Sequence, residues 1–62
     1  MYKRYEELCS ERGVTSYQVS KDTGIAQATL SDWKTGRSKP KVDKLLKIAS
    51  YFGVPIDELI EE

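Results

Sequence analysis

The side chains with the most distinctive chemistry lie between residues 27 and 41, where the sequence reads QATLSDWKTGRSKPK. Small hydrogen-bonding side chains come first, and basic side chains follow them on both sides of a proline. Amide, hydroxyl and carboxylate groups suit hydrogen bonding to a polar partner, and the basic groups suit phosphate. The single tryptophan, Trp33, lies within this stretch, either as a stacking surface for a ligand or as the packing anchor of a short helix.

Residues for catalysis are scarce by comparison. The 62 residues include no histidine, which removes the commonest general base and the commonest zinc ligand. Cys9 is the one cysteine, so it forms no intramolecular disulfide, and without a base we expect a small apolar helix-face residue rather than a nucleophile. The acid pairs Glu6–Glu7 and Glu61–Glu62 are most simply solvated helix surface. We therefore expect no enzyme activity, no metal site and no cofactor.

Charge is distributed unevenly although the formal net charge is zero. Residues 1–33 carry four basic and five acidic side chains, and residues 34–47 carry six basic side chains against Asp43 alone. Residues 48–62 carry four acidic side chains and no basic one. A basic patch is typical of a phosphate-binding surface, but the charge pattern alone equally allows an ordinary solvated surface.

Glycine and proline residues divide the chain into five pieces of roughly 8 to 13 residues, with breaks at Gly13, Gly24, Gly36, Pro40, Gly53 and Pro55. Apolar residues in these pieces recur at helical spacing, and long alternation of strand type is absent. Thr15 precedes the second piece as a cap, with Gln18 three residues later in a capping-box pattern. The pattern predicts an all-α bundle of five short helices in a single domain, residues 1–62.

The expected core-facing residues follow from the same spacing. They are Tyr5, Leu8 and Cys9 in the first piece, Val19 in the second, Leu30 and Trp33 in the third, and Val42, Leu45, Leu46, Ala49 and Phe52 in the fourth. The fifth piece carries the apolar residues Ile56, Leu59 and Ile60. Several scattered aromatics are also better explained by packing than by ligand stacking: Tyr2, Tyr5, Tyr17, Tyr51 and Phe52.

The third piece, about residues 27–35, has two unlike sides when drawn as a helix. Leu30 and Trp33 share one side, which indicates that Trp33 anchors the helix to the core. The opposite side carries only small or polar side chains: Gln27, Ala28, Ser31, Asp32 and Thr35. A helix with so narrow an apolar stripe depends on its neighbours for stability. Such a polar face suits the DNA major groove, and Lys34, Arg37, Lys39 and Lys41 then lie where they can reach phosphates.

The ordered motifs from Gly13 to Ile60, GVTSYQVSKDTGIAQATLSDWKTGRSKPKVDKLLKIASYFGVPIDELI, resemble the helix-turn-helix domain of phage repressor/Cro-like (XRE-type) regulators. The shared series is a capped short helix, a turn glycine, a helix of the form (S/A)QxT(I/L)SxW, a glycine, a basic loop, a proline and an LLKIAxxFGV helix. The resemblance implies a lambda-repressor-like DNA-binding domain of five helices, in which helices 2 and 3 form the helix-turn-helix. Two departures stand out: Ser16 replaces a common glutamine, and Ala26 replaces the usual serine or threonine cap.

The resemblance also implies roles for individual residues. Base contacts fall on Gln27, Ala28, Ser31 and Asp32, and Thr29 beside them is a further base-contact candidate that could instead serve a phosphate. Phosphate contacts fall on Ser16, Tyr17, Lys34, Thr35, Arg37, Lys39 and Lys41. Three roles remain open for Asp32. Its carboxylate accepts a hydrogen bond from cytosine, or it pairs with Lys34, Arg37 or another base, or it deters non-specific binding. Relatives bind as dimers to two half-sites about 34–36 Å apart, and the apolar C-terminal residues Ile56, Leu59 and Ile60 are the expected dimer interface.

These features predict a sequence-specific DNA-binding transcriptional regulator, in particular a repressor that acts as a homodimer on a two-fold symmetric operator. The alternative is a protein-interaction module on the same fold, such as an antitoxin or anti-repressor. No apolar run approaches the ~18 residues that cross a membrane, and the first residues, MYKRYEELC, are too charged for a signal peptide. We therefore expect a soluble, cytoplasmic protein.

Overall fold

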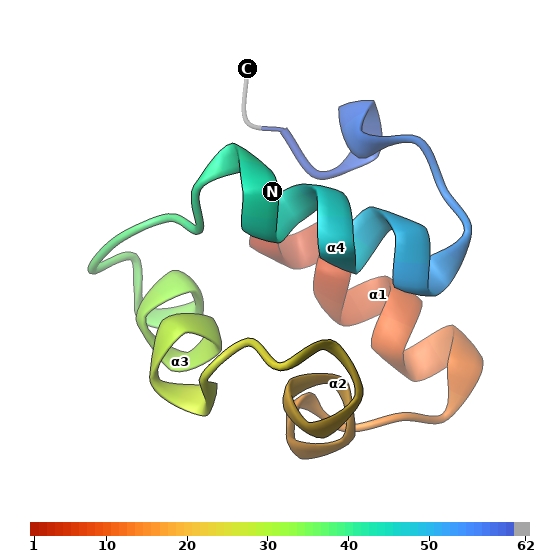
Figure 1. Ribbon diagram of the computed structural model, residues 1–62, viewed down its shortest axis with the longest axis horizontal. Helices are drawn as coiled ribbons and strands as arrows, with labels where there is room; N and C mark the ends of the chain where they lie inside the picture. The colour runs from red at the N-terminus through yellow and green to blue at the C-terminus, as the bar shows by residue number, and fades with distance from the viewer. Residues whose placement is uncertain (61–62) are drawn as a thin grey trace.

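Four α-helices and one short 3₁₀ turn make up the computed structural model, which describes residues 1–60 (Figure 1). The helices are α1 (Tyr2–Arg12), α2 (Ser16–Thr23), α3 (Gln27–Thr35) and α4 (Val42–Phe52), and the turn η1 covers Ile56–Glu58. The described part of the chain contains no strand, which confirms the all-α class. Glu61 and Glu62, predicted to be helix surface, lie outside the described residues. None of the helices described is long and apolar enough to cross a membrane.

The fifth helix of the prediction is a single turn of 3₁₀ helix instead. Its backbone bonds join residues three apart, from Glu58 N to the Pro55 carbonyl at 3.1 Å and from Leu59 N to the Ile56 carbonyl at 2.8 Å. Leu59 then packs into the core with 1% of its surface exposed. A segment this short forms too few bonds to fix a regular α-helix, and burial of its leucine holds the chain in place.

Glycines end all four α-helices, as the sequence predicted. At the start of α2, the Thr15 hydroxyl accepts a hydrogen bond from the Gln18 backbone N–H at 3.2 Å, so the predicted cap is present. The other half of the capping box does not form, because the Gln18 side chain donates forward to both carboxylate oxygens of Asp22 at 3.0 Å. Ala26, at the start of α3, provides no side-chain cap, as expected from its methyl group.

The core is built mainly from one side of each helix. Its twelve buried residues are Tyr5, Leu8, Cys9, Val19, Ile25, Leu30, Trp33, Leu45, Ile48, Ala49, Phe52 and Leu59. The prediction for α4 was wrong at two positions: Val42 is 62% exposed and Leu46 is 51% exposed. At about 100° per residue these two side chains point to the flank of the arc that Leu45 and Ile48 occupy, so the narrow core does not reach them.

Aromatic rings form a continuous group within this core, rather than the scatter that the sequence indicated. The Trp33 ring lies 5.3 Å from that of Tyr5, which in turn lies 6.1 Å from Phe52. The ring of Phe52 also contacts that of Tyr51 at 5.1 Å. Tyr17 is the exception, because it lies on the surface at 59% exposure. The group links α1, α3 and α4 through ring contacts of the tilted and edge-to-face kind that aromatic pairs favour.

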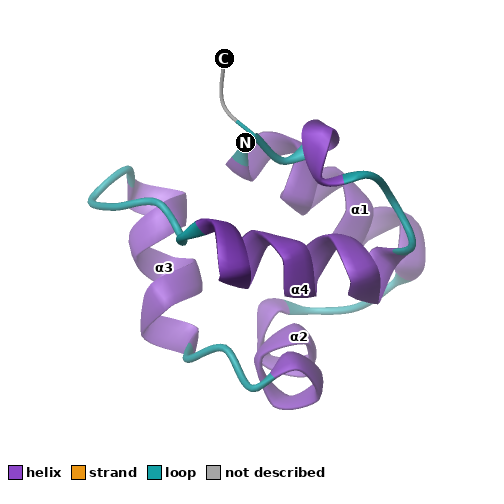
Figure 2. Ribbon diagram, turned by 45° about the horizontal axis from the view of Figure 1, so that its top comes forward, coloured by secondary structure: helices purple, strands orange, loops and turns teal. Residues whose placement is uncertain are grey.

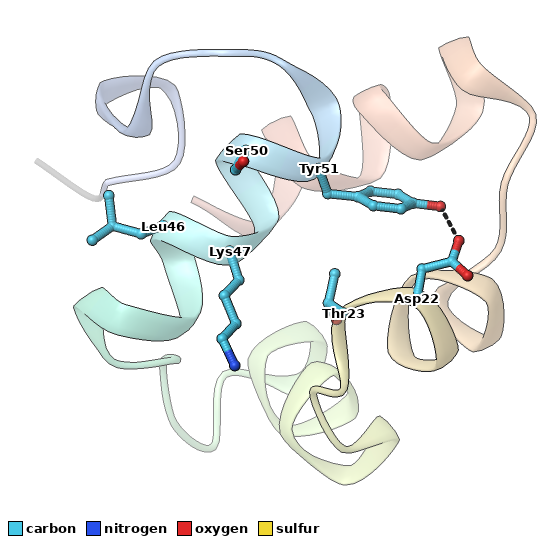
Figure 3. A pocket seen from close by; sticks show the side chains of 6 residues that line it. All are labelled: Asp22, Thr23, Leu46, Lys47, Ser50 and Tyr51. Carbon is cyan, nitrogen blue, oxygen red and sulfur yellow. Dashed lines mark hydrogen bonds between the residues drawn. The ribbon is translucent and has the colours of Figure 1, made fainter.

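A polar contact fixes α2 against α4 at the surface. The Tyr51 hydroxyl donates to the Asp22 carboxylate at 2.6 Å, across the mouth of an open hollow between the two helices (Figure 3). Asp22 also accepts from Gln18, so the carboxylate receives hydrogen bonds from both helices. This interaction was not predicted from the sequence, and it connects the first helix of the helix-turn-helix unit to the most apolar helix of the domain.

Replacing Tyr51 by phenylalanine removes the hydroxyl and leaves the ring. The hydrogen bond from Tyr51, followed by that from Gln18, holds the pKa of Asp22 below its ordinary value of 3.8. A carboxyl group with a lowered folded pKa stabilises the fold above its unfolded pKa, and this contribution is lost as the pH falls through the folded pKa. We therefore expect Tyr51→Phe to lower the urea midpoint at neutral pH, by a difference that shrinks below about pH 4.

Asp22→Asn is the matched control, because asparagine still accepts from Tyr51 but does not titrate. In the Asp22→Asn background, the effect of removing the Tyr51 hydroxyl on the urea midpoint should be independent of pH. A Tyr51→Phe effect that stays constant with pH in the wild-type background would contradict this account of the interaction.

Candidate nucleic-acid interface

One side of α3 is held firmly by the core. Leu30 is 1% exposed and Trp33 is 6% exposed, as the helical spacing predicted. The Trp33 ring contacts the ring of Tyr2 at 5.5 Å in an edge-to-face arrangement and that of Tyr5 at 5.3 Å. The indole is therefore a packing anchor, and its faces are occupied by α1 rather than open to a ligand.

The other side of α3 is open. Gln27, Ala28, Ser31 and Thr35 are exposed, while Thr29 and Asp32 are half-buried at its margins. Figure 2 shows α3 at the edge of the molecule, with the loop of residues 36–41 leaving its end and α2 packed beside its start. The five residues predicted to contact bases therefore lie together on one short helix, with their exposed members facing away from the core.

Gly36 determines where the basic loop leaves α3. Its backbone adopts φ 81° and ψ 7°, a left-handed conformation that side chains disfavour. This conformation lets the Gly36 N–H bond to the Trp33 carbonyl at 3.2 Å and the Arg37 N–H bond to the Asp32 carbonyl at 2.9 Å. The paired bonds are those of a Schellman motif, which reverses the chain sharply at a helix end. Arg37 is consequently held within one turn of the polar face by its own backbone.

The Asp32 side chain turns toward this loop. Its Oδ1 atom lies 3.8 Å from Nε of Arg37, in a pair whose arginine is largely exposed. Of the three alternatives for Asp32, this geometry supports pairing with Arg37. An exposed pair at this distance contributes at most about 1 kcal/mol, so the guanidinium can exchange the carboxylate for a phosphate at little cost.

The basic and acidic ends inferred from the sequence are separate in space. Lys34, Lys39 and Lys41 are exposed, and within residues 1–60 no carboxylate lies at ion-pairing distance from them. Three carboxylates gather instead around Arg4, whose guanidinium pairs with Glu58 at 2.8 Å, Glu7 at 3.2 Å and Glu11 at 3.6 Å. Both ribbon views place α3 and its loop on one side of the molecule and η1 on the other (Figures 1 and 2).

Three hydroxyl groups belong to the predicted phosphate contacts, and they differ in what they already bond. The Tyr17 side chain is exposed on the first turn of α2. The Thr35 hydroxyl donates to the Asp32 carbonyl at 3.3 Å, so its hydrogen already serves the helix end. The Ser16 oxygen lies 2.8 Å from the Tyr5 hydroxyl, which reaches it from the core.

The predicted dimer residues do not form one exposed patch. Leu59 is 1% exposed within a single chain, so it presents no surface to a second copy, and this part of the prediction was wrong. Its side chain fills the domain's own core because the 3₁₀ turn folds back onto α4. Ile60 is 43% exposed and Ile56 is half-buried against the core. Exposed Leu46 and Val42, which the sequence had placed in the core, add apolar surface on α4.

Sequence reasoning missed the Tyr5 hydroxyl as a partner of the interface. Tyr5 was placed in the core from its spacing, and its ring is indeed buried. The residue type itself was a signal in the sequence. A buried tyrosine hydroxyl requires a hydrogen-bond partner, whereas a leucine or phenylalanine in the core requires none. The partner itself, eleven residues away at Ser16, could not be read from the pattern.

The sequence model of the helix-turn-helix family matches this chain from residue 5 to residue 59. The match covers α1 from its fourth residue, all of α2, α3, α4 and η1, and the loop that follows α3. The chain belongs to the XRE-type helix-turn-helix family. Members of this family are DNA-binding transcription regulators, which is not an enzyme class.

Three curated proteins similar to this chain are named as transcription regulators. The cryptic phage CTXphi transcriptional repressor RstR of Vibrio cholerae is 29% identical over 95% of this chain and 53% of its own length. The HTH-type transcriptional regulator DdrOP3 of Deinococcus deserti is 32% identical over 95% of this chain and 46% of its own. The HTH-type transcriptional activator BcrR of Enterococcus faecalis is 26% identical over 94% of this chain and 28% of its own.

This XRE-type chain therefore spans about half, or less, of the length of these curated relatives. The similarity concerns the helix-turn-helix domain itself. No solved structure matches the chain with comparable significance.

Substituting Trp33 by alanine is expected to lower the free energy of unfolding by about 3–5 kcal/mol, because the indole fills the space between α3 and α1. That is a large share of the ~5–15 kcal/mol that stabilises an ordinary domain. Urea unfolding followed by circular dichroism measures the change. Ser31→Ala, on the open side of the same helix, should stay within about 0.5 kcal/mol of the wild type. A Trp33→Ala protein as stable as the wild type would contradict the anchoring role.

Proposed function

We propose that this domain binds double-stranded DNA sequence-specifically and that it does so by laying the open face of α3 in the major groove. The observation that carries the proposal is the pairing of a buried Leu30–Trp33 side with an exposed polar side on one nine-residue helix. The major groove admits a single α-helix and presents a distinct donor and acceptor pattern for each base pair. The Gln27 amide can form two hydrogen bonds with adenine, and the Ser31 hydroxyl can bond to a donor or an acceptor on a base edge. The Ala28 methyl can contact the thymine methyl.

Phosphate contacts on both sides of α3 would set the orientation of the helix in the groove. Lys34, Arg37, Lys39 and Lys41 follow the helix, and Ser16 and Tyr17 begin α2, which packs against α3. Backbone N–H groups at the start of a helix favour an anion there. These contacts supply affinity without reading sequence, while the α3 face supplies discrimination.

We propose repression as the regulatory outcome. Occupying an operator is sufficient to block access to DNA, whereas activation requires a further contact with the transcription machinery. The open face of α3 is the surface proposed to meet the operator, and the relative RstR is named a transcriptional repressor.

A homodimer on two half-sites would use the exposed apolar residues near the end of the described chain. In Figure 1 the chain after η1 runs back above the first half of α4, and Leu46 points from α4 toward the end of the described chain (Figure 3). We therefore propose Ile60, Leu46 and Val42 as the centre of the interface, with Ile56 at its margin and Leu59 excluded. Three side chains form a surface that is small compared with the ~800 Å² that each partner buries in a stable complex. This dimer would therefore form mainly on DNA.

Gln27→Ala and Arg37→Ala are expected to weaken binding in different ways. Loss of the Gln27 amide should cost about 1–3 kcal/mol at one base position and leave other positions unchanged. Loss of Arg37 should weaken all duplexes alike and make the slope of log affinity against log salt shallower by about 0.9. Selection from random duplexes, followed by salt titration on the selected sequence, measures both effects.

The same experiment tests the proposed function as a whole. Enrichment of a consensus with two-fold symmetry, bound with strong salt dependence, is the expected result. A uniform loss for Gln27→Ala would show that this residue only positions the domain, and a changed base preference for Arg37→Ala would contradict its phosphate role. No enrichment of any duplex would favour the protein-interaction module instead.

Leu46→Asp is expected to reduce affinity for a two-half-site operator roughly tenfold, equivalent to about 1.4 kcal/mol of lost interaction between copies. Affinity for a single half-site should be unchanged, because Leu46 is half-exposed and lies on a different helix from the DNA-facing residues. Binding curves on full and half operators measure the two quantities. Ser10→Asp, an equal change of charge on exposed α1, is the control and should affect neither. Equal losses on both operators would exclude Leu46 from a dimer interface.

A further inference from the structure

A buried hydroxyl lies directly behind the first residue of α2. The Tyr5 side chain is fully enclosed, and its phenol oxygen lies 2.8 Å from Oγ of Ser16. Ring contacts with Trp33 on α3 and with Phe52 on α4 hold the phenol in this position. Ser16 is half-buried at the first position of α2, so part of the residue lies at the surface while its Oγ contacts Tyr5. The core therefore touches a predicted phosphate contact through one defined hydrogen bond.

The position of the hydrogen in this bond determines what Ser16 can do. Burial, partly opposed by the Ser16 hydroxyl, raises the pKa of Tyr5, so the phenol keeps its hydrogen throughout the physiological range. Besides Ser16, the phenol interacts with the Cys9 thiol. A thiol sulfur is a weak hydrogen-bond acceptor and a serine oxygen is a good one. The 2.8 Å contact allows either hydroxyl to donate, and this difference in acceptor strength favours donation from the phenol to Ser16.

A serine oxygen that accepts from inside must direct its own hydrogen elsewhere. A hydroxyl has a single hydrogen, and with the inner side occupied by the Tyr5 hydrogen, that of Ser16 turns toward the surface beside the first turn of α2. Accepting one hydrogen bond also strengthens the hydroxyl as a donor of the next. A phosphate oxygen accepts hydrogen bonds and donates none, so an outward hydrogen is the arrangement that a phosphate requires.

We propose that Tyr5 is a positioning residue for DNA binding: from the core, its hydroxyl fixes the Ser16 hydroxyl with its hydrogen directed at a backbone phosphate. This inference rests on the proposed function and adds to it a role for a residue that touches no DNA. It also gives a reason for tyrosine in a position where another aromatic ring would pack equally well. The phenol links the stability of the aromatic group to the geometry of the α2 contact.

A double-mutant cycle on the selected duplex tests the proposal with Tyr5→Phe, Ser16→Ala and the double variant. Phenylalanine keeps the ring contacts and removes only the hydroxyl. Ser16→Ala should weaken binding roughly tenfold, as expected for a hydrogen bond to a charged group, and Tyr5→Phe should weaken it about three- to tenfold. The double variant should bind within about twofold of Ser16→Ala, because Tyr5 acts only through Ser16.

Two further measurements separate positioning from a structural role. The salt slope of Tyr5→Phe should equal that of the wild type, since a serine contact neutralises no phosphate. Thermal unfolding identifies a temperature at which every variant is folded, and binding is compared there. Cys9→Ala should leave affinity unchanged, because the phenol donates to Ser16 and not to sulfur.

Several results would overturn the proposal. They are wild-type affinity for Tyr5→Phe, a double variant weakened by the product of the two single losses, a shallower salt slope for Tyr5→Phe, or a changed affinity for Cys9→Ala. The shallower slope would show that the hydroxyl holds α2 and its charged neighbours in place generally. A wild-type domain that binds no duplex would overturn the proposed function itself, a result distinct from all of these.

Discussion

The burial of Leu30 and Trp33 beneath α3 is the interaction on which the rest of the interface depends. A nine-residue helix is too short to persist in water by its own hydrogen bonds. Its sequence adds little, because α3 begins at an alanine without a side-chain cap and most of its other side chains are small and polar. Burying two large side chains, each worth about 1.5–3 kcal/mol or more, provides the stability that the exposed side cannot. The polar face exists as a rigid surface only because the opposite face is anchored.

The same anchoring extends to the groups around α3. The Trp33 ring contacts Tyr5, and the Tyr5 hydroxyl contacts Ser16 at the start of α2. At the other end, Gly36 turns the chain so that Arg37 bonds back to the Asp32 carbonyl. Both predicted phosphate-binding regions are thus connected to the core through α3 or its packing partners. The positions of Ser16 and Arg37 relative to the open face of α3 are therefore held by helix packing and by the backbone bonds at the end of α3.

Much of this architecture could be predicted from the sequence because it depends on local rules. Glycine-terminated helices and the 3.6-residue period gave the α-helices and the buried and open sides of α3. The period gives the direction of an apolar stripe but not its width, so Val42 and Leu46 were placed in a core too small to include them. Likewise, a short apolar segment does not show which residues pack inward, and Leu59 was assigned to a partner although it fills the domain's own core.

The unpredicted parts of the site are hydrogen bonds between residues far apart in the chain. Tyr5 meets Ser16 from another helix, and Tyr51 meets Asp22 across 29 positions. These pairs depend on how the helices pack, which no single-helix pattern contains. Each of these tyrosines nevertheless carries a hydroxyl at a position where a purely apolar ring would pack. The sequence therefore indicates that the hydroxyl has a hydrogen-bond partner, but not which residue it is.

The charge distribution explains how a domain of zero net charge can suit DNA. The basic loop after α3 and the turn η1, whose Glu58 pairs with Arg4, lie on opposite sides of a molecule with a largest extent of 24 Å. At physiological salt the field of a charge decays over about 8 Å, so phosphates beside the basic loop experience that loop and little of the acidic side. If the domain binds DNA as proposed, the acids around Arg4 would weaken the attraction of DNA to their side of the domain. In the proposed complex this asymmetry would favour one orientation toward DNA before any base is contacted, which the zero net charge of the sequence does not reveal.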